Sequence, residues 1–250
     1  STVQWGVENA QKLICPCKRW QGLLHYQQFH EKRTGLCEEI PRCVSPGQHR
    51  ESVHHLRLYD AAFSEGKLCR EKNLRTYQPA WAELVSNSLQ HRYPQSNIIK
   101  KNRAAGGSTV QWGVENAQKL ICPCKPDLVI LGFGMNSMQE PAEVYKTAIL
   151  SIIQTIRSEC PDCEFLLVSP MIPNPEIRGF QHNQLPAQQD ALYQIAAESE
   201  GICVAPVHSM FRELVAHKKH YLELTGNCIN HPNDFSIRIY AQTILSVLGC

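Results

Sequence analysis

The sequence predicts an α/β fold, a three-layer α/β/α sandwich in which helices cover both faces of a five-stranded parallel sheet. Two observations lead to this class. From about residue 54 onward, apolar runs of strand length alternate with segments of helical periodicity. The run at 128–133 is apolar without interruption, which is typical of a strand buried on both faces of a parallel sheet. Strands that alternate with helices pair in parallel through right-handed crossovers.

Each expected strand leads into a segment with helical spacing. In the third of these segments the apolar residues include Val144, Ala148 and Ile152. Asp234 directly precedes the last apolar run, so we expect it to cap the closing helix. The strands are expected at 54–59, 97–101, 128–133, 163–169 and 202–207, and the helices at 79–91, 110–120, 140–158, 185–199, 210–217 and 234–248.

The predicted topology also indicates where chemistry should occur. Open parallel sheets bind their ligands beyond the carboxyl ends of the strands. We therefore expect functional residues in the loops that follow the strands and in the loop before the last helix. These segments are 60–66, 104–108, 132–137, 169–177 and 225–234.

The chain contains a perfect repeat whose two copies lie in different sequence contexts. The segment STVQWGVENAQKLICPCK occurs at 1–18 and again at 108–125. The second copy follows Gly106-Gly107 and precedes an apolar strand, whereas the first copy leads into a polar stretch without clear periodicity. True repeat architectures need several units that pack on one another. We expect 1–53 to be an irregular extension that contains the duplicate, and 54–250 to be the domain.

Composition and motifs give no support to several classes of function. The chain has 25 Lys and Arg against 23 Asp and Glu, which gives no electrostatic argument for a nucleic-acid or membrane partner. Its apolar runs are far too short to span a bilayer. No signal-peptide profile, phosphate loop, nucleotide fingerprint or His-rich metal motif is visible. We expect no cofactor and, by default, a cytoplasmic location; the oligomeric state is not predicted.

Two pairs of the twelve cysteines stand out by their spacing, Cys122 with Cys124 and Cys160 with Cys163. Each pair falls between a predicted helix and the strand after it, so both pairs belong to the same edge of the sheet. Free thiols in ordinary turns are the simplest interpretation. A structural zinc site or disulfide bonds at the edge opposite the ligand-binding loops are the alternatives.

Three of the expected loops carry motifs of one superfamily. PDLVILGFGMNSM contains Gly134 and Asn136 after an apolar strand, NRAAGGSTVQWG contains Gly107, and LTGNCINHPNDFSIRIYAQTIL contains His231. These segments resemble the blocks of the SGNH (GDSL-type) hydrolases, in the same order and on the same kinds of element. The resemblance covers about residues 55–250 and implies the flavodoxin-like SGNH hydrolase fold.

The resemblance also implies roles for individual residues. In these esterases a serine attacks the ester carbonyl while a histidine takes its proton, and that histidine corresponds to His231. The Gly107 backbone N–H and the Asn136 side-chain amide correspond to donors that stabilise the oxyanion. Without the resemblance, a turn glycine, a loop-capping asparagine and a structural histidine would explain the same residues.

The sequence departs from the superfamily at three positions. When LRLYDAAFSEG is aligned on Tyr59 and Gly66, the nucleophile position is Ala62, which cannot attack a carbonyl. Ser64 could replace it only in a shifted alignment that loses the glycine match. Cys228 stands three residues before His231, where the superfamily has its acid, and Ser137 stands where Asp is usual. These changes suggest a decayed or altered site.

Two functions are consistent with this pattern. The first is an SGNH-type carboxylic ester hydrolase, acting on acyl or acetyl esters that include those of carbohydrates, with impaired catalysis because of Ala62. The second is a pseudoenzyme that keeps the pocket and binds an acylated ligand or a protein partner. A gene-model artefact of a family member, without a distinct function, is the third interpretation.

Overall fold

The computed structural model describes residues 79–250 and the backbone of 55–60. The duplicate at 1–18, the expected extension at 1–53 and the residues Ala62 and Ser64 lie outside the described residues, so those predictions stay predictions. In the described part of the chain, no helix is both long enough and apolar enough to cross a bilayer.

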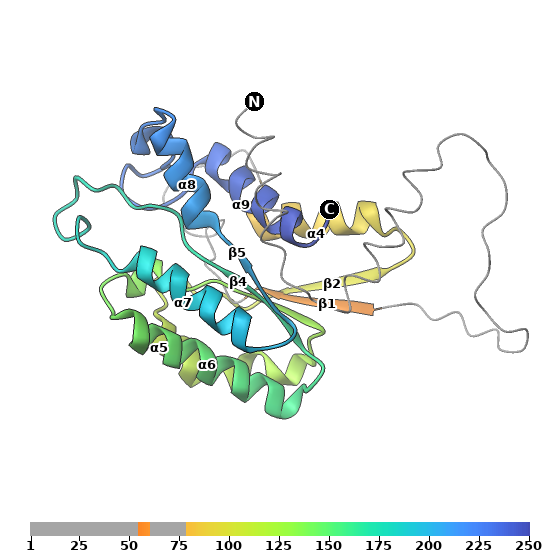
Figure 1. Ribbon diagram of the computed structural model, residues 1–250. Helices are drawn as coiled ribbons and strands as arrows, with labels where there is room; N and C mark the ends of the chain where they lie inside the picture. Colours follow the sequence, from red (N-terminus) through yellow and green to blue (C-terminus); the bar gives the residue numbers. More distant parts are fainter. Residues whose placement is uncertain (1–54, 61–78) are drawn as a thin grey trace, which may run out of the picture.

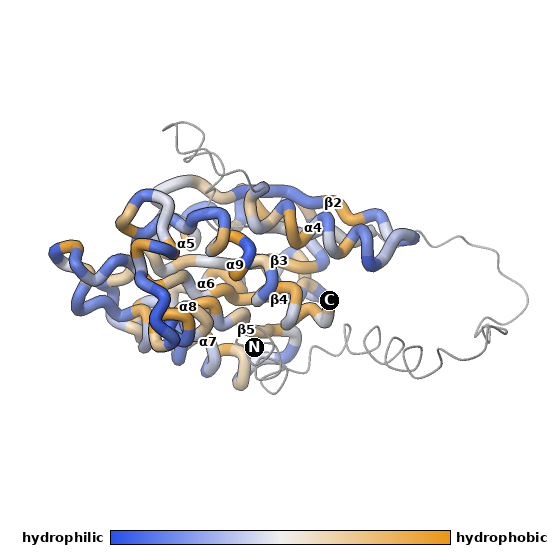
Figure 2. The backbone as a smooth tube through the Cα atoms, turned by 90° about the horizontal axis from the view of Figure 1, so that it is seen from above, coloured by the Kyte–Doolittle hydropathy of each residue, from blue (hydrophilic) through white to orange (hydrophobic). Residues whose placement is uncertain are grey.

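The strands form one parallel sheet, as predicted for an α/β fold. Its order is β2-β1-β3-β4-β5, and every neighbouring pair is parallel. The inner strands β3 and β4 are buried at every position, which explains their uninterrupted apolar sequence. The edge strand β2 carries two lysines and is largely hydrophilic (Figure 2). The bounds are β1 His55–Asp60, β2 Asn97–Asn102, β3 Leu128–Leu131, β4 Glu164–Val168 and β5 Ile202–Ala205.

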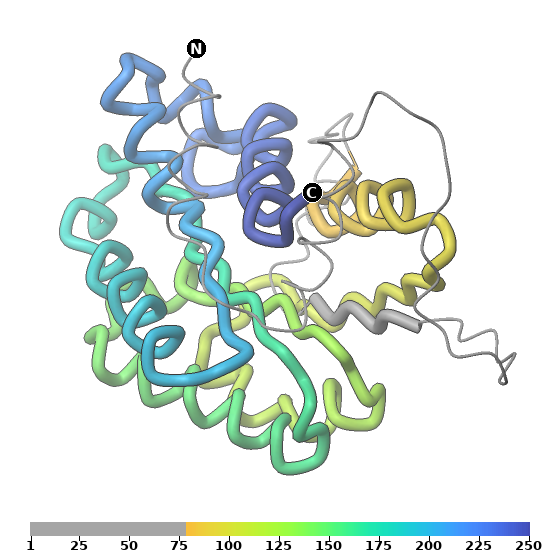
Figure 3. The backbone as a smooth tube through the Cα atoms, turned by 45° about the vertical axis from the view of Figure 1, so that its right-hand side comes forward, coloured from red at the N-terminus to blue at the C-terminus, as the bar shows by residue number. Residues whose placement is uncertain are grey.

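In the part of the chain that the structure describes, six α-helices cover the two faces of this sheet (Figures 1 and 3). One layer contains α5, α6 and α7, and the other contains α4, α8 and α9. The predicted three-layer α/β/α class is thus confirmed. The bounds are α4 Trp81–Arg92, α5 Val110–Leu120, α6 Ala142–Glu159, α7 Leu185–Glu198, α8 Val207–Ala216 and α9 Asp234–Val247.

The core consists of two apolar clusters, one on each face of the sheet. Successive side chains of a strand point to opposite faces, so β3 contributes to both clusters. Leu128 and Ile130 pack with residues of α4, α8 and α9, whereas Val129 and Leu131 pack with residues of α5, α6 and α7. Burial on both faces fixes the positions of the loops that leave the carboxyl ends of β3 and β4.

Several predicted details were wrong. Asn233, not Asp234, caps α9, because its side-chain oxygen accepts the Ser236 N–H at 3.0 Å and Asp234 is already the first helical residue. Val144 is 54% exposed. The buried stripe of α6 begins instead at Tyr145, whose hydroxyl donates to the Phe133 carbonyl at 2.9 Å.

Two boundaries near the carboxyl edge of the sheet also differ from the prediction. Strand β3 ends at Leu131, two residues early, because the chain leaves the sheet there to enter the loop after it. Strand β5 ends at Ala205, and α8 starts at Val207 rather than at 210. Pro206 separates them, since a proline has no N–H for the strand ladder and readily precedes or opens a helix.

Gly113 permits the close contact between α5 and its neighbours. A Cβ atom at this position would lie 2.6 Å from Cζ of Phe133 and 2.8 Å from Cδ1 of Ile152, both of which are buried. Overpacking at contacts this short should cost about 2–3 kcal/mol, and alanine gains ~1 kcal/mol in helix propensity. We therefore expect Gly113→Ala to lower the free energy of unfolding by about 1–2 kcal/mol. Urea unfolding checks this, with the exposed Lys119→Ala as the control on the same helix. A Gly113→Ala protein as stable as the unmodified chain would contradict it.

Candidate active site

The loop between β2 and α5 contains Gly107. This residue has φ +80°, a left-handed conformation that glycine adopts without strain. A Cβ atom there would meet nothing within 4 Å, so backbone conformation, and not crowding, is what favours glycine. Two residues later, Thr109 caps α5 by accepting the Trp112 N–H at 3.3 Å. The turn at Gly107 therefore directs the chain from the sheet edge into a capped helix.

Asn136 lies in the short 3-10 helix η2 (Met135–Ser137) that follows β3, and its side chain is exposed. Its Nδ2 donates a hydrogen bond to the Ser108 carbonyl at 3.1 Å. This contact joins the loop after β3 to the residue that follows Gly107. An amide nitrogen carries two N–H groups, so one donor of Asn136 is used by this contact and a second is left for a ligand.

Ser137, where the resemblance expects Asp, is buried and connects three segments. Its Oγ accepts the Val110 N–H at 3.0 Å, at the first turn of α5. Its carbonyl accepts a hydrogen bond from Nε2 of Gln188 on α7 at 2.8 Å. The serine hydroxyl thus supplies an acceptor to a helix N-terminus, a position whose N–H groups have no partner within the helix. The Asp-to-Ser difference does not leave this end of α5 unsatisfied.

His231 lies half-buried in the loop before α9, and the side chain of Asn227 fixes the conformation of that loop. Oδ1 of Asn227 accepts the backbone N–H groups of Ile229, Asn230 and His231, each at 3.0 Å. The Gly226 N–H donates to the His231 carbonyl at 2.7 Å. The backbone that carries the imidazole is therefore held from inside its own turn, as asparagine side chains commonly do.

Cys228 stands where the resemblance expects the usual acid. Its side chain is exposed and its backbone is left-handed, with φ +59°. The carbonyl of Cys228 accepts a hydrogen bond from Nδ2 of Asn174 at 2.8 Å, and the Asn174 N–H donates to the Ile229 carbonyl at 2.7 Å. Asn174 comes from the loop after β4 and is buried. It clamps this loop to the histidine loop.

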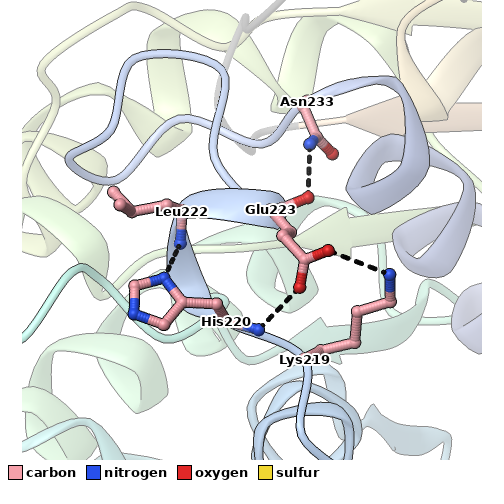
Figure 4. A network of polar contacts seen from close by, with 5 residues as sticks. All are labelled: Lys219, His220, Leu222, Glu223 and Asn233. Carbon is pink, nitrogen blue, oxygen red and sulfur yellow. Dashed lines mark hydrogen bonds and ion pairs between the residues drawn. The ribbon is translucent and has the colours of Figure 1, made fainter.

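The far end of the histidine loop is fastened by a polar network (Figure 4). The Glu223 carboxylate accepts the His220 backbone N–H at 2.9 Å and lies 3.5 Å from Nζ of Lys219. The pKa of Glu223 is lowered, chiefly by the His220 N–H and then by Lys219. Nδ2 of Asn233 donates to the Glu223 carbonyl at 2.6 Å. Asn233 therefore both caps α9 and ties that helix to the network.

These loops surround one open pocket at the carboxyl edge of the sheet. Three loops contribute one polar residue each to its lining. Ser108 comes from the loop that contains Gly107, Asn136 from the loop after β3, and Asn230 from the loop that contains His231. An apolar wall is formed by the buried rings of Trp81 and Tyr240, which stack with centroids 6.3 Å apart. The remaining lining residues are Ala105, Gly132, Phe133, Gly134, Met135, Val168, Ser169 and Pro170.

The apolar wall is anchored to the loop after β4. The Tyr240 hydroxyl accepts the Met171 backbone N–H at 2.7 Å, and this hydrogen bond fixes the position of the ring relative to that loop. Within residues 79–250, no three His, Cys, Asp or Glu side chains are arranged to hold a metal ion. The pocket thus offers amide and hydroxyl groups beside an aromatic surface.

Four of the five loops that the sequence predicts contribute residues to this pocket, and the loop at 60–66 lies almost wholly outside the described residues. Several other residues that shape the pocket were not predicted. Trp81 and Tyr240 were expected only as helix residues, and Asn174 and Asn227 were not singled out. The asparagines act through backbone contacts that no spacing rule reveals. A helical aromatic residue that faces a pocket has the same sequence pattern as one that faces the core.

The parallel sheet, the position of the pocket and the loop motifs agree with the SGNH-type hydrolase fold that the sequence predicts. A sequence model of the GDSL-like lipase/acylhydrolase family matches residues 64–235, more than half of the chain. The chain therefore belongs to this family. The matched range includes Gly107, Asn136 and His231 and begins after Ala62. A search of curated protein sequences found no match.

Solved structures have the same fold at low sequence identity. LAE5, an alpha/beta hydrolase enzyme from the metagenome of Lake Arreo, is 19% identical, with a TM-score of 0.59 over 79% of this chain and 95% of its own. A putative GDSL-like lipase from Parabacteroides merdae is 12% identical, with a TM-score of 0.64 over 79% and 96%. Axe2, an acetylxylan esterase from Geobacillus stearothermophilus, is 18% identical, with a TM-score of 0.63 over 80% and 95%. At these identities the likeness shows the fold.

Proposed function

We propose that residues 54–250 form an SGNH-type carboxylic ester hydrolase unit whose catalysis is impaired at the nucleophile position, Ala62. The observation that carries the proposal is the convergence of three loops on one pocket. Asn136 bonds to the residue after Gly107, and Asn230, the neighbour of His231, lines the same pocket. Residues from separate parts of the sequence are thus grouped where an acyl ester could bind.

In this proposal the pocket binds the carbonyl group of an ester. The Gly107 N–H and the second N–H of the Asn136 amide would donate to the carbonyl oxygen and, more strongly, to an oxyanion. The acyl group would lie against Trp81 and Tyr240. His231 would take a proton from a nucleophilic hydroxyl, which alanine at position 62 does not provide.

For the substrate we propose a small acyl ester, with acetyl groups on carbohydrate as the first class to test. Support comes from family membership and from the similar fold of Axe2, an acetylxylan esterase. A nucleic-acid partner has no support from the charge balance of the chain. The aromatic wall of the pocket suits an acyl group or the apolar face of a sugar ring.

The unmodified chain is expected to hydrolyse p-nitrophenyl acetate at a rate close to the uncatalysed background. The reason is that loss of the nucleophile costs on the order of a million-fold in rate. The measurement is turnover together with labelling by a fluorophosphonate, which reacts with activated serines. Rapid turnover with labelling at Ser64 would show that the alignment is shifted and that Ser64 is the nucleophile.

The second candidate function is that of a pseudoenzyme that binds an acylated ligand or a protein partner without turnover. It is favoured by the combination of Ala62 with Cys228, which removes both the nucleophile and the usual acid. Binding of acetylated xylo-oligosaccharides by calorimetry distinguishes the two. Binding that Asn136→Ala weakens, together with no activity after Ala62→Ser, would favour the pseudoenzyme.

A further inference from the structure

The two spaced cysteine pairs come together at one corner of the protein, and the proposed esterase chemistry uses neither pair. Cys122 and Cys124 form the short helix η1 (Cys122–Cys124) after α5. Cys160 is the C-cap residue that follows α6, and Cys163 directly precedes β4. This corner lies at the amino ends of β3 and β4, whereas the pocket lies beyond their carboxyl ends.

Cys122 and Cys160 lie against each other's segments. Sγ of Cys160 lies 3.9 Å from the carbonyl oxygen of Cys122, and Sγ of Cys122 lies 3.8 Å from the carbonyl oxygen of Thr155 on α6. Both side chains are buried in the cluster between α5 and α6. Each thiol therefore reaches the element that carries the other.

Polar contacts hold the same two segments together. Nε2 of Gln118 donates to the Glu159 carboxylate at 3.2 Å, and Nζ of Lys125 donates to the Glu159 carbonyl at 3.4 Å. These contacts fasten the chain on both sides of Cys122 to the residue before Cys160. The folded structure thus keeps the segments that carry the two thiols in contact.

The surroundings favour a bond between thiols over a metal site. Burial raises the pKa of Cys122, with smaller contributions from Glu159 and Cys160, and burial also raises the pKa of Cys160. A metal site would keep these sulfurs as thiolates, which burial disfavours, whereas thiol–disulfide exchange needs the thiolate only transiently. Across residues 79–250, no group of three or more ligating side chains has an arrangement suited to a metal ion. A disulfide bond, in contrast, carries no charge into the apolar cluster.

We propose that Cys122 and Cys160, both free thiols in this structure, form a disulfide bond when the protein meets an oxidising low-molecular-weight disulfide such as oxidised glutathione. The less buried Cys160 loses its proton and attacks one sulfur of the reagent, which forms a mixed disulfide and releases one glutathione thiolate. Cys122 then loses its proton and attacks Sγ of Cys160, which releases the second glutathione thiolate. Two protein thiols are oxidised, one reagent disulfide is reduced to two thiols, and the leaving thiolates take up the two protons.

The test compares the full chain in reduced and in oxidised glutathione. We expect oxidation to raise Tm by about 5–10 °C, because the bond restricts the unfolded chain. Peptide mapping without reduction should identify a peptide that links Cys122 to Cys160. Cys122→Ala and Cys160→Ala should each remove the oxidant-dependent rise in Tm, whereas Cys228→Ala, a change at an exposed cysteine, should keep it.

The rise is measured as a difference within each variant, so a lower absolute stability of a cavity-forming variant does not affect it. The linked peptide of the unmodified protein tests the pairing without any substitution. Three results would overturn the proposal: no linked peptide after oxidation, a link between Cys160 and Cys163 instead, or a zinc-dependent rise in Tm of the reduced protein that Cys122→Ala abolishes.

Discussion

Replacing Ala62 by serine is expected to raise the rate of p-nitrophenyl acetate hydrolysis by about 100-fold over the unmodified chain. Loss of the nucleophile from such a unit costs on the order of 10⁶-fold, and loss of the acid costs on the order of 10⁴-fold. A serine added to a site that still has Cys228 at the acid position should therefore recover only the smaller part. The second half of the test is fluorophosphonate labelling, which should appear at position 62.

Two further substitutions in the Ala62→Ser protein test the roles of the other residues. His231→Ala should return the rate to background, because the serine then lacks a base. Asn136→Ala should remove most or all of the roughly 100-fold gain, because an oxyanion donor contributes about 10²–10³-fold to kcat. Gln139→Ala is the matched control, since Gln139 is an exposed residue three positions along whose amide bonds to the Gly179 carbonyl and not to the glycine loop. Activity that survives His231→Ala would contradict the assigned base.

Cys228→Asp should raise the rate of the Ala62→Ser protein further. Aspartate is among the few residues that tolerate the left-handed backbone found at Cys228, so the substitution fits the existing turn. An acid beside the imidazole holds it in its productive orientation and stabilises its charged form. A rate unchanged by Cys228→Asp would show that the Cys228 side chain cannot reach His231.

The fold was predictable because burial dictates its pattern. A central strand such as β3, covered on both faces, must be apolar at every position, and the sequence shows this directly. The first residues of helices are harder to predict from the sequence than the central strands. The first turn of α8, with Val207 and His208, was missed because a buried polar residue interrupts the apolar spacing. The α9 cap was misplaced by one residue because Asn233 and Asp234 are both good capping residues.

The candidate residues of the site came only from motifs, two of them in loops that follow strands and one in the loop before the last helix. Gly107, Asn136 and His231 follow from position in the topology together with resemblance. The residues that hold these loops in place could not be predicted in the same way, because they act through hydrogen bonds between side chains and distant backbone groups. Asn174 is 54 residues from Cys228, whose carbonyl it binds. Contacts of this kind depend on how the loops pack, and a single sequence does not contain that information.

His208 is a buried group with a large expected effect on the pH dependence of stability. It lies in the first turn of α8, is 4% exposed, and its Nδ1 has no hydrogen-bond partner among the described residues. Its pKa is lowered to about 4, mainly by burial and then by Arg212, while a hydrogen bond to the Pro170 carbonyl and the charge of Asp190 act in the opposite direction. Pro170 lines the candidate pocket, so the same ring supports the pocket wall.

As the pH falls, the unfolded chain takes up a proton at this histidine near its ordinary pKa of about 6.5, whereas the folded protein does so only near 4. Between these values the unfolded state binds more protons, so stability must decrease as the pH decreases. The contribution of His208 to the free energy of unfolding is fully present above about pH 6.5 and is lost by about pH 4. This loss amounts to about 3 kcal/mol.

Urea unfolding at pH 7 and at pH 4.5 measures this loss, and His208→Gln separates it from the titration of carboxylates. Glutamine stays neutral and can still donate to the Pro170 carbonyl, so the variant should lose about 2.5 kcal/mol less than the unmodified protein over this interval. His217→Gln, a change at an exposed histidine of the same segment, should lose as much as the unmodified protein. An equal loss in His208→Gln would mean that burial of His208 does not govern the acid sensitivity. The comparison depends only on differences between two pH values, so a change in absolute stability caused by the substitution does not alter its meaning.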